Sequence, residues 1–123
     1  MTAASLRKRC LEAAEAVEEF PFGPRVSVFK VGGKMFALSD LNAEPLKVSL
    51  KCDPELAKQL RATYDAVAPG YHLNKQHWNT ITLDGSLSDD VVHDLIEDSY
   101  DLVVAGLPKA TRQRLRIKDS AGA

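Results

Sequence analysis

The chain has 123 residues, the ordinary size of one domain and enough to bury a core without disulfides or a metal ion. Apolar residues make up 45% and charged residues 27%, a globular balance that excludes extensive disorder. The net charge is −1, which excludes the large positive excess typical of strong non-specific nucleic-acid binders.

The two cysteines, Cys10 and Cys52, form no CxxC pair and no cluster with histidines, so zinc-finger spacing is absent. Their spacing alone does not exclude a disulfide between them. The first ten residues hold no long apolar run, and no stretch approaches the ~18 apolar residues that span a bilayer. We therefore expect a cytoplasmic protein with reduced thiols and no membrane partner.

The first predicted element is a helix over residues 5–18, because Leu6, Cys10 and Val17 recur at helical spacing on one apolar stripe. The two prolines of the segment 20–24 are expected to end this helix, since proline cannot continue its hydrogen-bond ladder.

A β-hairpin is the strongest local pattern. Residues 26–31 and 34–39 are rich in Val, Phe, Met and Leu and are predicted to be strands. Gly32 and Gly33 between them favour a two-residue turn, because glycine tolerates the positive φ that such turns require. The clean alternation along 46–51 predicts a third strand with one buried face and one wet face.

A short helix follows this strand. Asp53 is a good cap and Pro54 suits the first helical position. The helix is predicted to end near Tyr64, with Leu56, Leu60 and Tyr64 as its buried stripe.

The last third of the chain is predicted to contain two strands, 71–73 and 78–84, and a long helix. Ser88 caps this helix, and Gly106 and Pro108 end it. Its buried face is predicted at five positions with helical spacing: Val92, Leu95, Ile96, Ser99 and Val103.

The predicted order of elements is α-β-β-β-α-β-β-α. Hairpins imply a mainly antiparallel sheet, and its apolar face must be covered by helices. The expected fold class is therefore α+β, with two layers, in a single domain over residues 1–123. Residues 108–123 form a basic C-terminal segment, either a short helix or a loose tail.

Five short segments form a distinctive pattern along the chain: Pro21-Phe22-Gly23, Val28-Phe29-Lys30-Val31-Gly32-Gly33-Lys34-Met35-Phe36-Ala37-Leu38, Asn74-Lys75-Gln76-His77-Trp78-Asn79-Thr80, Leu83-Asp84-Gly85 and Ser99-Tyr100-Asp101-Leu102-Val103. In this order they resemble the MmcQ/YjbR family over roughly residues 5–110. The resemblance implies an α+β fold similar to type III secretion chaperones and frataxin-like proteins. It also implies DNA binding, which is the usual description of the family.

Two sets of side chains are candidates for DNA contact. In the 74–78 turn, Lys75 and His77 could grip a phosphate and Trp78 could stack on a base. Alternatively this is a polar turn entering a strand, and we favour a core position for Trp78. The second set could form a basic stripe across the sheet or could instead protect the sheet from aggregation; its members are Lys30, Lys34, Lys47 and Lys51.

Catalytic and metal motifs are not found. The chain contains no GxSxG, Walker-type loop, GxGxxG or HExxH. A hard cation could sit near His93 among the acidic residues of the last helix, but an acidic helix start is the ordinary explanation. We predict no metal site and no cofactor.

Three functions are compatible with these patterns. The first is a non-enzymatic module that binds DNA through a basic sheet face and the 74–78 turn. The alternative is a protein-interaction or homodimeric, chaperone-like module, which requires an exposed apolar patch. The third is an enzyme or a small-ligand protein, and it requires a concave pocket with convergent polar groups.

Overall fold

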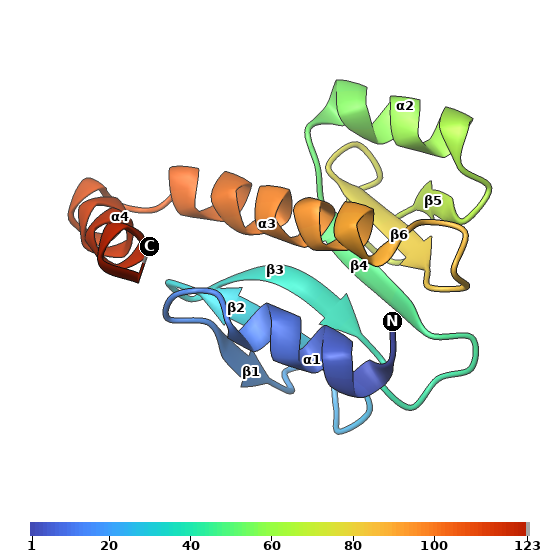
Figure 1. Ribbon diagram of the computed structural model, residues 1–123, viewed down its shortest axis with the longest axis horizontal. Coiled ribbons are helices and arrows are strands. Elements are labelled where there is room, and N and C mark those ends of the chain that lie inside the picture. The colour runs from blue at the N-terminus through green and yellow to red at the C-terminus, as the bar shows by residue number, and fades with distance from the viewer. Residues whose placement is uncertain (123) are drawn as a thin grey trace.

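Six antiparallel strands form one sheet in the order β1-β2-β3-β4-β6-β5 (Figure 1). The computed structural model describes residues 1–122, and side chains as far as Arg116. The strands are β1 (Val17–Glu19), β2 (Ser27–Val31), β3 (Lys34–Ser39), β4 (Lys47–Lys51), β5 (Val67–Pro69) and β6 (Trp78–Thr82). The predicted α+β fold class is confirmed.

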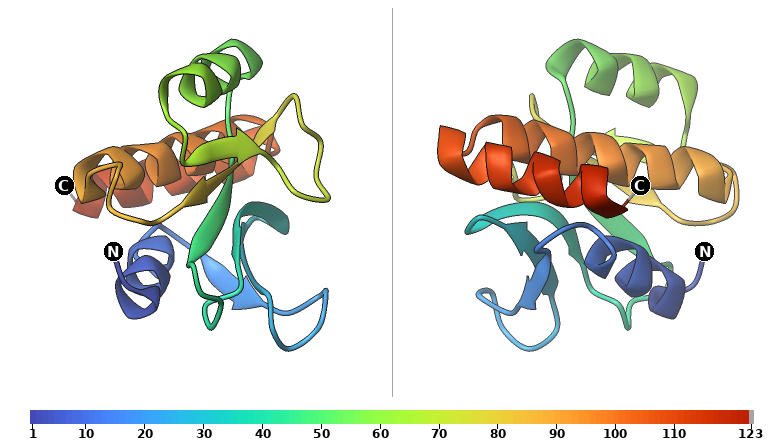
Figure 2. Two further views of the ribbon diagram at one scale, coloured as in Figure 1. Left: turned by 90° about the vertical axis from the view of Figure 1, so that its right-hand side faces the viewer. Right: turned by 60° about the vertical axis from the view of Figure 1, so that its left-hand side comes forward.

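The four helices lie on one side of this sheet, so the protein has two layers (Figure 2). α3 packs against β3 and β4, whereas α2 packs against β5 and β6. The buried Asn79 of β6 donates from Nδ2 to the Ala57 carbonyl of α2, at 3.3 Å. The helices are α1 (Ala3–Leu11), α2 (Pro54–Thr63), α3 (Asp89–Ala105) and α4 (Lys109–Gly122).

The predicted hairpin joins β2 and β3. Gly32 and Gly33 have φ values of +57° and +79°, the left-handed conformation expected of its two turn residues. The register of the two strands shifts between Phe29 and Lys30, because Phe36 is an extra residue in β3. This β-bulge changes which face of the sheet the later residues of β3 occupy.

The core lies between the sheet and the helices. All five residues predicted to line the buried face of α3 are buried, and Tyr100 joins them. The Tyr100 hydroxyl donates to the Ala14 carbonyl at 2.7 Å, and its ring meets Phe36 edge-on. Cys10 and Cys52 are both buried as free thiols.

The predicted helix over 5–18 is wrong in its second half. α1 ends at Leu11, and Glu15 has a φ of +57°, which no right-handed helix accommodates. Val17–Glu19 instead forms the edge strand β1, paired with β2. The backbone hydrogen bonds gained along β2 outweigh the helical propensity of this segment.

The predicted buried stripe of α2 is also wrong in part. Ala57 is the fully buried residue of this helix, whereas Leu56 is 36% exposed. Leu60 and Tyr64 pack at the margin of the core. The helix approaches the sheet through its smallest side chain, which is why the hydrogen bond from Asn79 reaches its backbone.

The strand predicted at 71–73 lies earlier in the chain. β5 precedes Gly70 and pairs with β6 as an edge strand, where Pro69 needs no ladder donor. His72 has a φ of +58°, and the segment 70–77 is a loop.

The basic C-terminal segment is helical. α4 packs on the core through Leu115, and Arg114 forms a two-pronged contact with Glu15. Ala123 and the side chain of Lys118 lie outside the described residues. Within residues 1–122, every helix falls short of the length or the hydropathy that crossing a membrane requires.

Candidate binding site

The side of the sheet opposite the helices is here called the open face. Strand register places five side chains in one row across it: Val28, Leu38, Ser49, Thr80 and Ala68. The middle of this row is lined with hydroxyls, since Ser49 Oγ and Thr80 Oγ1 are hydrogen-bonded at 2.8 Å. All of these side chains except Val28 line the floor of a depression.

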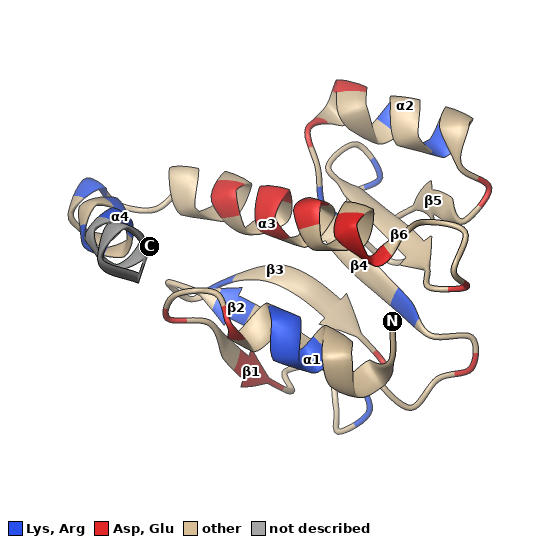
Figure 3. Ribbon diagram, viewed as in Figure 1, with Lys and Arg blue, Asp and Glu red and all other residues tan. Residues whose placement is uncertain are grey.

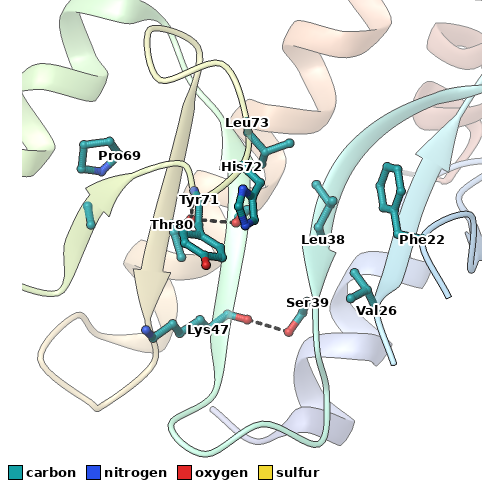
Figure 4. A pocket seen from close by; sticks show the side chains of 12 residues that line it. Phe22, Val26, Leu38, Ser39, Lys47, Pro69, Tyr71, His72, Leu73 and Thr80 are labelled. Carbon is teal, nitrogen blue, oxygen red and sulfur yellow. Dashed lines mark hydrogen bonds between the residues drawn. The ribbon is translucent and has the colours of Figure 1, made fainter. Parts of the chain in front are cut away.

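A pocket of about 730 Å³ occupies this floor (Figure 4). The loop 70–77 provides one wall, with Tyr71, His72 and Leu73. Phe22 and Val26, from the connection before β2, stand on the other side beside Leu38. The complete lining is Phe22, Val26, Leu38, Ser39, Lys47, Ser49, Ala68, Pro69, Tyr71, His72, Leu73 and Thr80.

The loop wall is pressed against β6 at Gly70. A Cβ at this position would lie 2.7 Å from the Cβ of Trp78, so only glycine permits the approach. The Gly70 amide donates to the Trp78 carbonyl at 2.8 Å, and Tyr71 N donates to Thr80 Oγ1 at 3.3 Å. These contacts fix the base of the loop.

Two cations hold the rest of the loop. Lys75 Nζ donates to the Gly70 carbonyl at 3.1 Å and so closes the loop on itself. Arg61 of α2 donates from Nε to Asn79 Oδ1 at 2.7 Å and from its terminal nitrogen to the Lys75 carbonyl. The pocket wall is therefore braced from behind by a side chain that does not reach the pocket.

Exposed aromatic rings surround a mainly apolar interior. Tyr71 is 74% exposed and Phe22 is 63% exposed. The Tyr71 ring lies over His72, with 4.0 Å between the ring centroids. Lys47 is the single charged side chain in the described lining, and no described carboxylate is within ion-pair distance of it. The pocket combines stacking surfaces with one positive charge.

The four predicted strand lysines do not form one stripe. Lys47 and Lys51 lie on the open face, as their alternation predicts. Lys30 is also on this face but pairs with Glu19 at 3.0 Å. Lys34 lies opposite Val31, whose side chain is in the core, and so belongs to the helix side at the end of the hairpin.

The polar groups of the 74–78 turn that have described partners contact the chain itself. Trp78 is only 7% exposed and is therefore buried as expected, although its register opposite Lys51 puts it on the open face, beneath Gly70, and outside the main core cluster. The Lys75 ammonium bonds to the loop, as described above, and His77 accepts the Cys52 amide through its carbonyl at 2.7 Å. None of the side chains of Lys75, His77 and Trp78 lines the pocket.

Charge is unevenly distributed over the molecule (Figure 3). α3 carries six acidic residues and no lysine or arginine. The acidic residues near His93 do not converge, and the described residues contain no group of three or more His, Cys, Asp or Glu that could hold a metal ion.

Neither thiol is activated. Burial raises the pKa of Cys10 to about 12. Burial also raises the pKa of Cys52, and the carboxylates of Asp53 and Asp98 raise it further. A thiol is a nucleophile only as the thiolate, so both cysteines are poor nucleophiles near neutral pH.

Sequence reasoning missed most of the pocket. The sequence predicts that Phe22 belongs to the segment that ends the first helix and that 71–73 is a strand. Pro69 and Gly70 do mark a turn, and because turns run over the protein surface, Tyr71 directly after them could have been expected to be accessible. The position of Leu38 on the open face depends on the β-bulge, and no pattern in the sequence predicts that bulge.

The comparisons with known proteins agree on one family. The family model described as YjbR matches residues 11–102. The chain is 36% identical over 115 residues to the protein YjbR of Escherichia coli K12, covering 94% of this chain and 98% of the relative. It is 43% identical over 98 residues to YbdF of Escherichia coli O157:H7, covering 79% and 80%. Both relatives are described as uncharacterized.

Solved structures show the same fold. The crystal structure of Deinococcus radiodurans protein DR2400, with family-model domain DUF419, has a TM-score of 0.87 and 44% identity, covering 93% of this chain and 87% of that one. A crystal structure from Pseudomonas syringae has a TM-score of 0.73 and 29% identity, covering 84% and 99%.

Proposed function

The chain belongs to the YjbR family, and we propose that it is a non-enzymatic binding module whose ligand occupies the pocket of the open face. The ligand has a planar, largely apolar body and carries a negative charge. The observation that carries this proposal is the lining: exposed aromatic rings around an apolar interior, with Lys47 as its one formal charge in the described residues.

The size of the pocket supports a small ligand. Sites for small molecules have volumes of roughly 300–1,000 Å³, apolar walls and a few polar groups, and the pocket of about 730 Å³ has this character. The Ser49–Thr80 hydroxyl pair and His72 supply hydrogen-bonding groups at the floor and wall. Neither cysteine lines the pocket, and burial raises the pKa of both thiols, so no thiolate nucleophile is offered to a ligand there.

The test uses two fluorescent probes that differ by one charge. 1-Anilinonaphthalene-8-sulfonate has a planar body and a sulfonate, and N-phenyl-1-naphthylamine has the same body without it. Lys47→Gln is expected to weaken binding of the sulfonate about fivefold, the effect of losing roughly 1 kcal/mol of charge interaction. Binding of the neutral probe should be unchanged.

Lys51→Gln is the matched control, because Lys51 is on the same strand and face but outside the pocket lining. Tyr71→Ala should weaken both probes, since it removes a stacking ring. The proposal is contradicted if neither probe shows saturable binding. It is also contradicted if Lys47→Gln and Lys51→Gln weaken binding of the sulfonate probe equally.

DNA is the second candidate ligand, favoured by Lys47 and Lys51 projecting together from the open face. Two phosphate contacts predict a slope of about −1.8 for log affinity against log salt, or roughly a 12-fold loss between 50 and 200 mM. This is weak for a DNA-binding protein, so we rank it second. A salt titration with short duplex and single-stranded DNA tests it, and the double variant Lys47→Glu, Lys51→Glu should abolish the binding and its salt dependence.

A further inference from the structure

The Ser49–Thr80 hydroxyl pair on the floor of the open-face pocket has one hydrogen that no described residue accepts. Ser49 Oγ and Thr80 Oγ1 lie 2.8 Å apart, and either oxygen can be the donor. Each hydroxyl has one hydrogen and two acceptor lone pairs. The pair uses one of its two hydrogens internally, so the second hydrogen is left for another group.

The loop 70–77 supplies this pair with a donor and not with an acceptor. Tyr71 N donates to Thr80 Oγ1 at 3.3 Å, which occupies a lone pair of that oxygen. If Thr80 donates to Ser49, the remaining hydrogen belongs to Ser49, and in the opposite arrangement it belongs to Thr80. Both arrangements leave a hydrogen-bond donor on the floor of the pocket.

The side chains beside the pair do not accept this hydrogen. Strand register places Leu38 on one side of the pair and Ala68 on the other, and both side chains are apolar. Ser39 also lines the pocket, but its own hydroxyl donates to the Lys47 carbonyl at 2.6 Å. The donor of the pair is therefore directed to water or to a ligand.

A ligand that covers the floor displaces the water that would otherwise satisfy this donor. Ser49 and Thr80 are half-buried and line the pocket, so an occupant lies directly over them. A buried donor without a partner is unfavourable, whereas a donor that meets an acceptor is slightly stabilising. A site of this kind rejects an analogue that lacks the matching polar atom.

Lys47 determines which end of the ligand carries the charge. Lys47 and Ser49 are two residues apart on the same face of β4, which separates them by roughly 7 Å along the strand. Lys47 lies at the end of the pocket where its carbonyl meets Ser39 (Figure 4). A ligand with its acid group at Lys47 and its body between Tyr71 and Phe22 therefore passes over the hydroxyl pair.

We propose that the ligand is a planar aromatic acid with a hydrogen-bond acceptor on its ring system, either a carbonyl oxygen or an unprotonated ring nitrogen. The inference rests on the proposed function, because it concerns the same pocket and the same charge at Lys47. The remaining hydrogen of the Ser49–Thr80 pair selects this ligand. A hydrocarbon ring system of the same shape leaves that donor unpaired and binds more weakly.

The experiment compares three acids of one shape at neutral pH, by competition with 1-anilinonaphthalene-8-sulfonate. 2-Naphthoate has no acceptor in its rings, whereas quinoline-6-carboxylate and quinoline-7-carboxylate have a ring nitrogen at two different positions relative to the acid. At least one quinoline acid is expected to bind the wild type about fivefold more tightly than 2-naphthoate, which is the effect of one neutral hydrogen bond.

Three variants test the origin of this preference. The double variant Ser49→Ala, Thr80→Val should lose the preference and still bind 2-naphthoate, because both replacements keep an apolar floor. Ser39→Ala is the matched control, since it removes a lining hydroxyl whose hydrogen is already donated, and it should keep the preference. Lys47→Gln should weaken all three acids alike and also keep the preference.

Three results would overturn this inference. A wild type that binds 2-naphthoate as tightly as both quinoline acids has no donor that selects an acceptor, and this comparison needs no variant. A preference that persists in the double variant, or one that Lys47→Gln removes, would place the acceptor at another group. The proposed function survives all three results. It fails, together with this inference, if neither the acids nor the naphthalene probes bind.

Discussion

The buried hydroxyl of Ser99 connects α3 to two strands, and its removal is expected to destabilise the protein strongly. Ser99 Oγ donates to the Phe36 carbonyl at 2.6 Å and accepts from the Lys51 amide at 2.8 Å. Ser99 is fully buried, so water cannot replace either contact. In the variant Ser99→Ala, both backbone groups lose their partner while the fold keeps its packing.

The expected loss of unfolding free energy follows from the Phe36 carbonyl and the Lys51 amide, which are left without this hydrogen-bond partner. An unsatisfied buried donor or acceptor costs about 1–3 kcal/mol, so two such groups should lower the free energy of unfolding by about 2–6 kcal/mol. The extra cavity is negligible, because only an oxygen atom is removed. Domains are stable by about 5–15 kcal/mol, and the change is therefore a large share of the total.

Urea denaturation followed by circular dichroism measures this loss. The control is Ser49→Ala, which removes a hydroxyl from the open face, where its partner Thr80 remains accessible to water. This control should cost less than about 1 kcal/mol. The reasoning is refuted if Ser99→Ala is no more destabilising than Ser49→Ala, with equal denaturant slopes for both proteins.

Two further predictions concern the hairpin and a buried thiol. Gly33→Ala should lower the free energy of unfolding by about 1 kcal/mol, because alanine disfavours the positive φ at this position. Gly32→Ala should lower it further, because the added Cβ would lie 2.7 Å from Leu107 Cδ1. Thermal unfolding compares the two variants, and equal losses of stability would contradict the contact with Leu107. Burial raises the pKa of Cys10 to about 12, so the folded state keeps a proton that the unfolded thiol releases above about pH 8.5. The stability that the protonated Cys10 thiol contributes is fully present below about pH 8.5 and is lost as the pH rises toward 12. The difference in unfolding free energy between the wild type and Cys10→Ala should therefore narrow above pH 8.5, by up to about 1.4 kcal/mol per pH unit. A difference that stays constant from pH 7 to about pH 10 would refute this prediction.

Local patterns predicted the elements whose own residues determine them. The Gly32-Gly33 turn fixes the β2–β3 hairpin, and Ser88 with its acidic neighbours fixes the start of α3. Alternation in β4 places Val48 and Leu50 in the core and Lys47 on the open face. In each case a short stretch of chain carries the complete signal.

Elements that depend on distant partners were misassigned. Val17 follows a helical apolar pattern, yet it pairs with Lys30 at the edge of the sheet. Leu56 falls on a plausible helical stripe, but the short side chain of Ala57 sets the closest approach of α2. Propensity is a weak guide when a neighbouring strand supplies the hydrogen bonds.

The predicted basic stripe fails in part because hairpin register decides on which face of the sheet each lysine lies. A two-residue turn pairs Val31 with Lys34, so Lys34 must share the face of a core residue. That consequence was available from the sequence, since the turn itself was predicted. The ion pair between Lys30 and Glu19 was not available, because it requires the unexpected strand β1.

The β-bulge explains why the sequence does not predict the part of the pocket that Leu38 forms. Strict alternation from the buried Phe36 would put Leu38 on the helix side, whereas the extra residue turns Leu38 to the open face opposite Val28. The same bulge is where Ser99 binds the Phe36 carbonyl. A hydroxyl on the buried stripe of α3 thus stabilises the irregularity that brings Leu38 to the floor of the pocket. Ser99→Ala is expected to weaken probe binding at the open face even though Ser99 does not line the pocket.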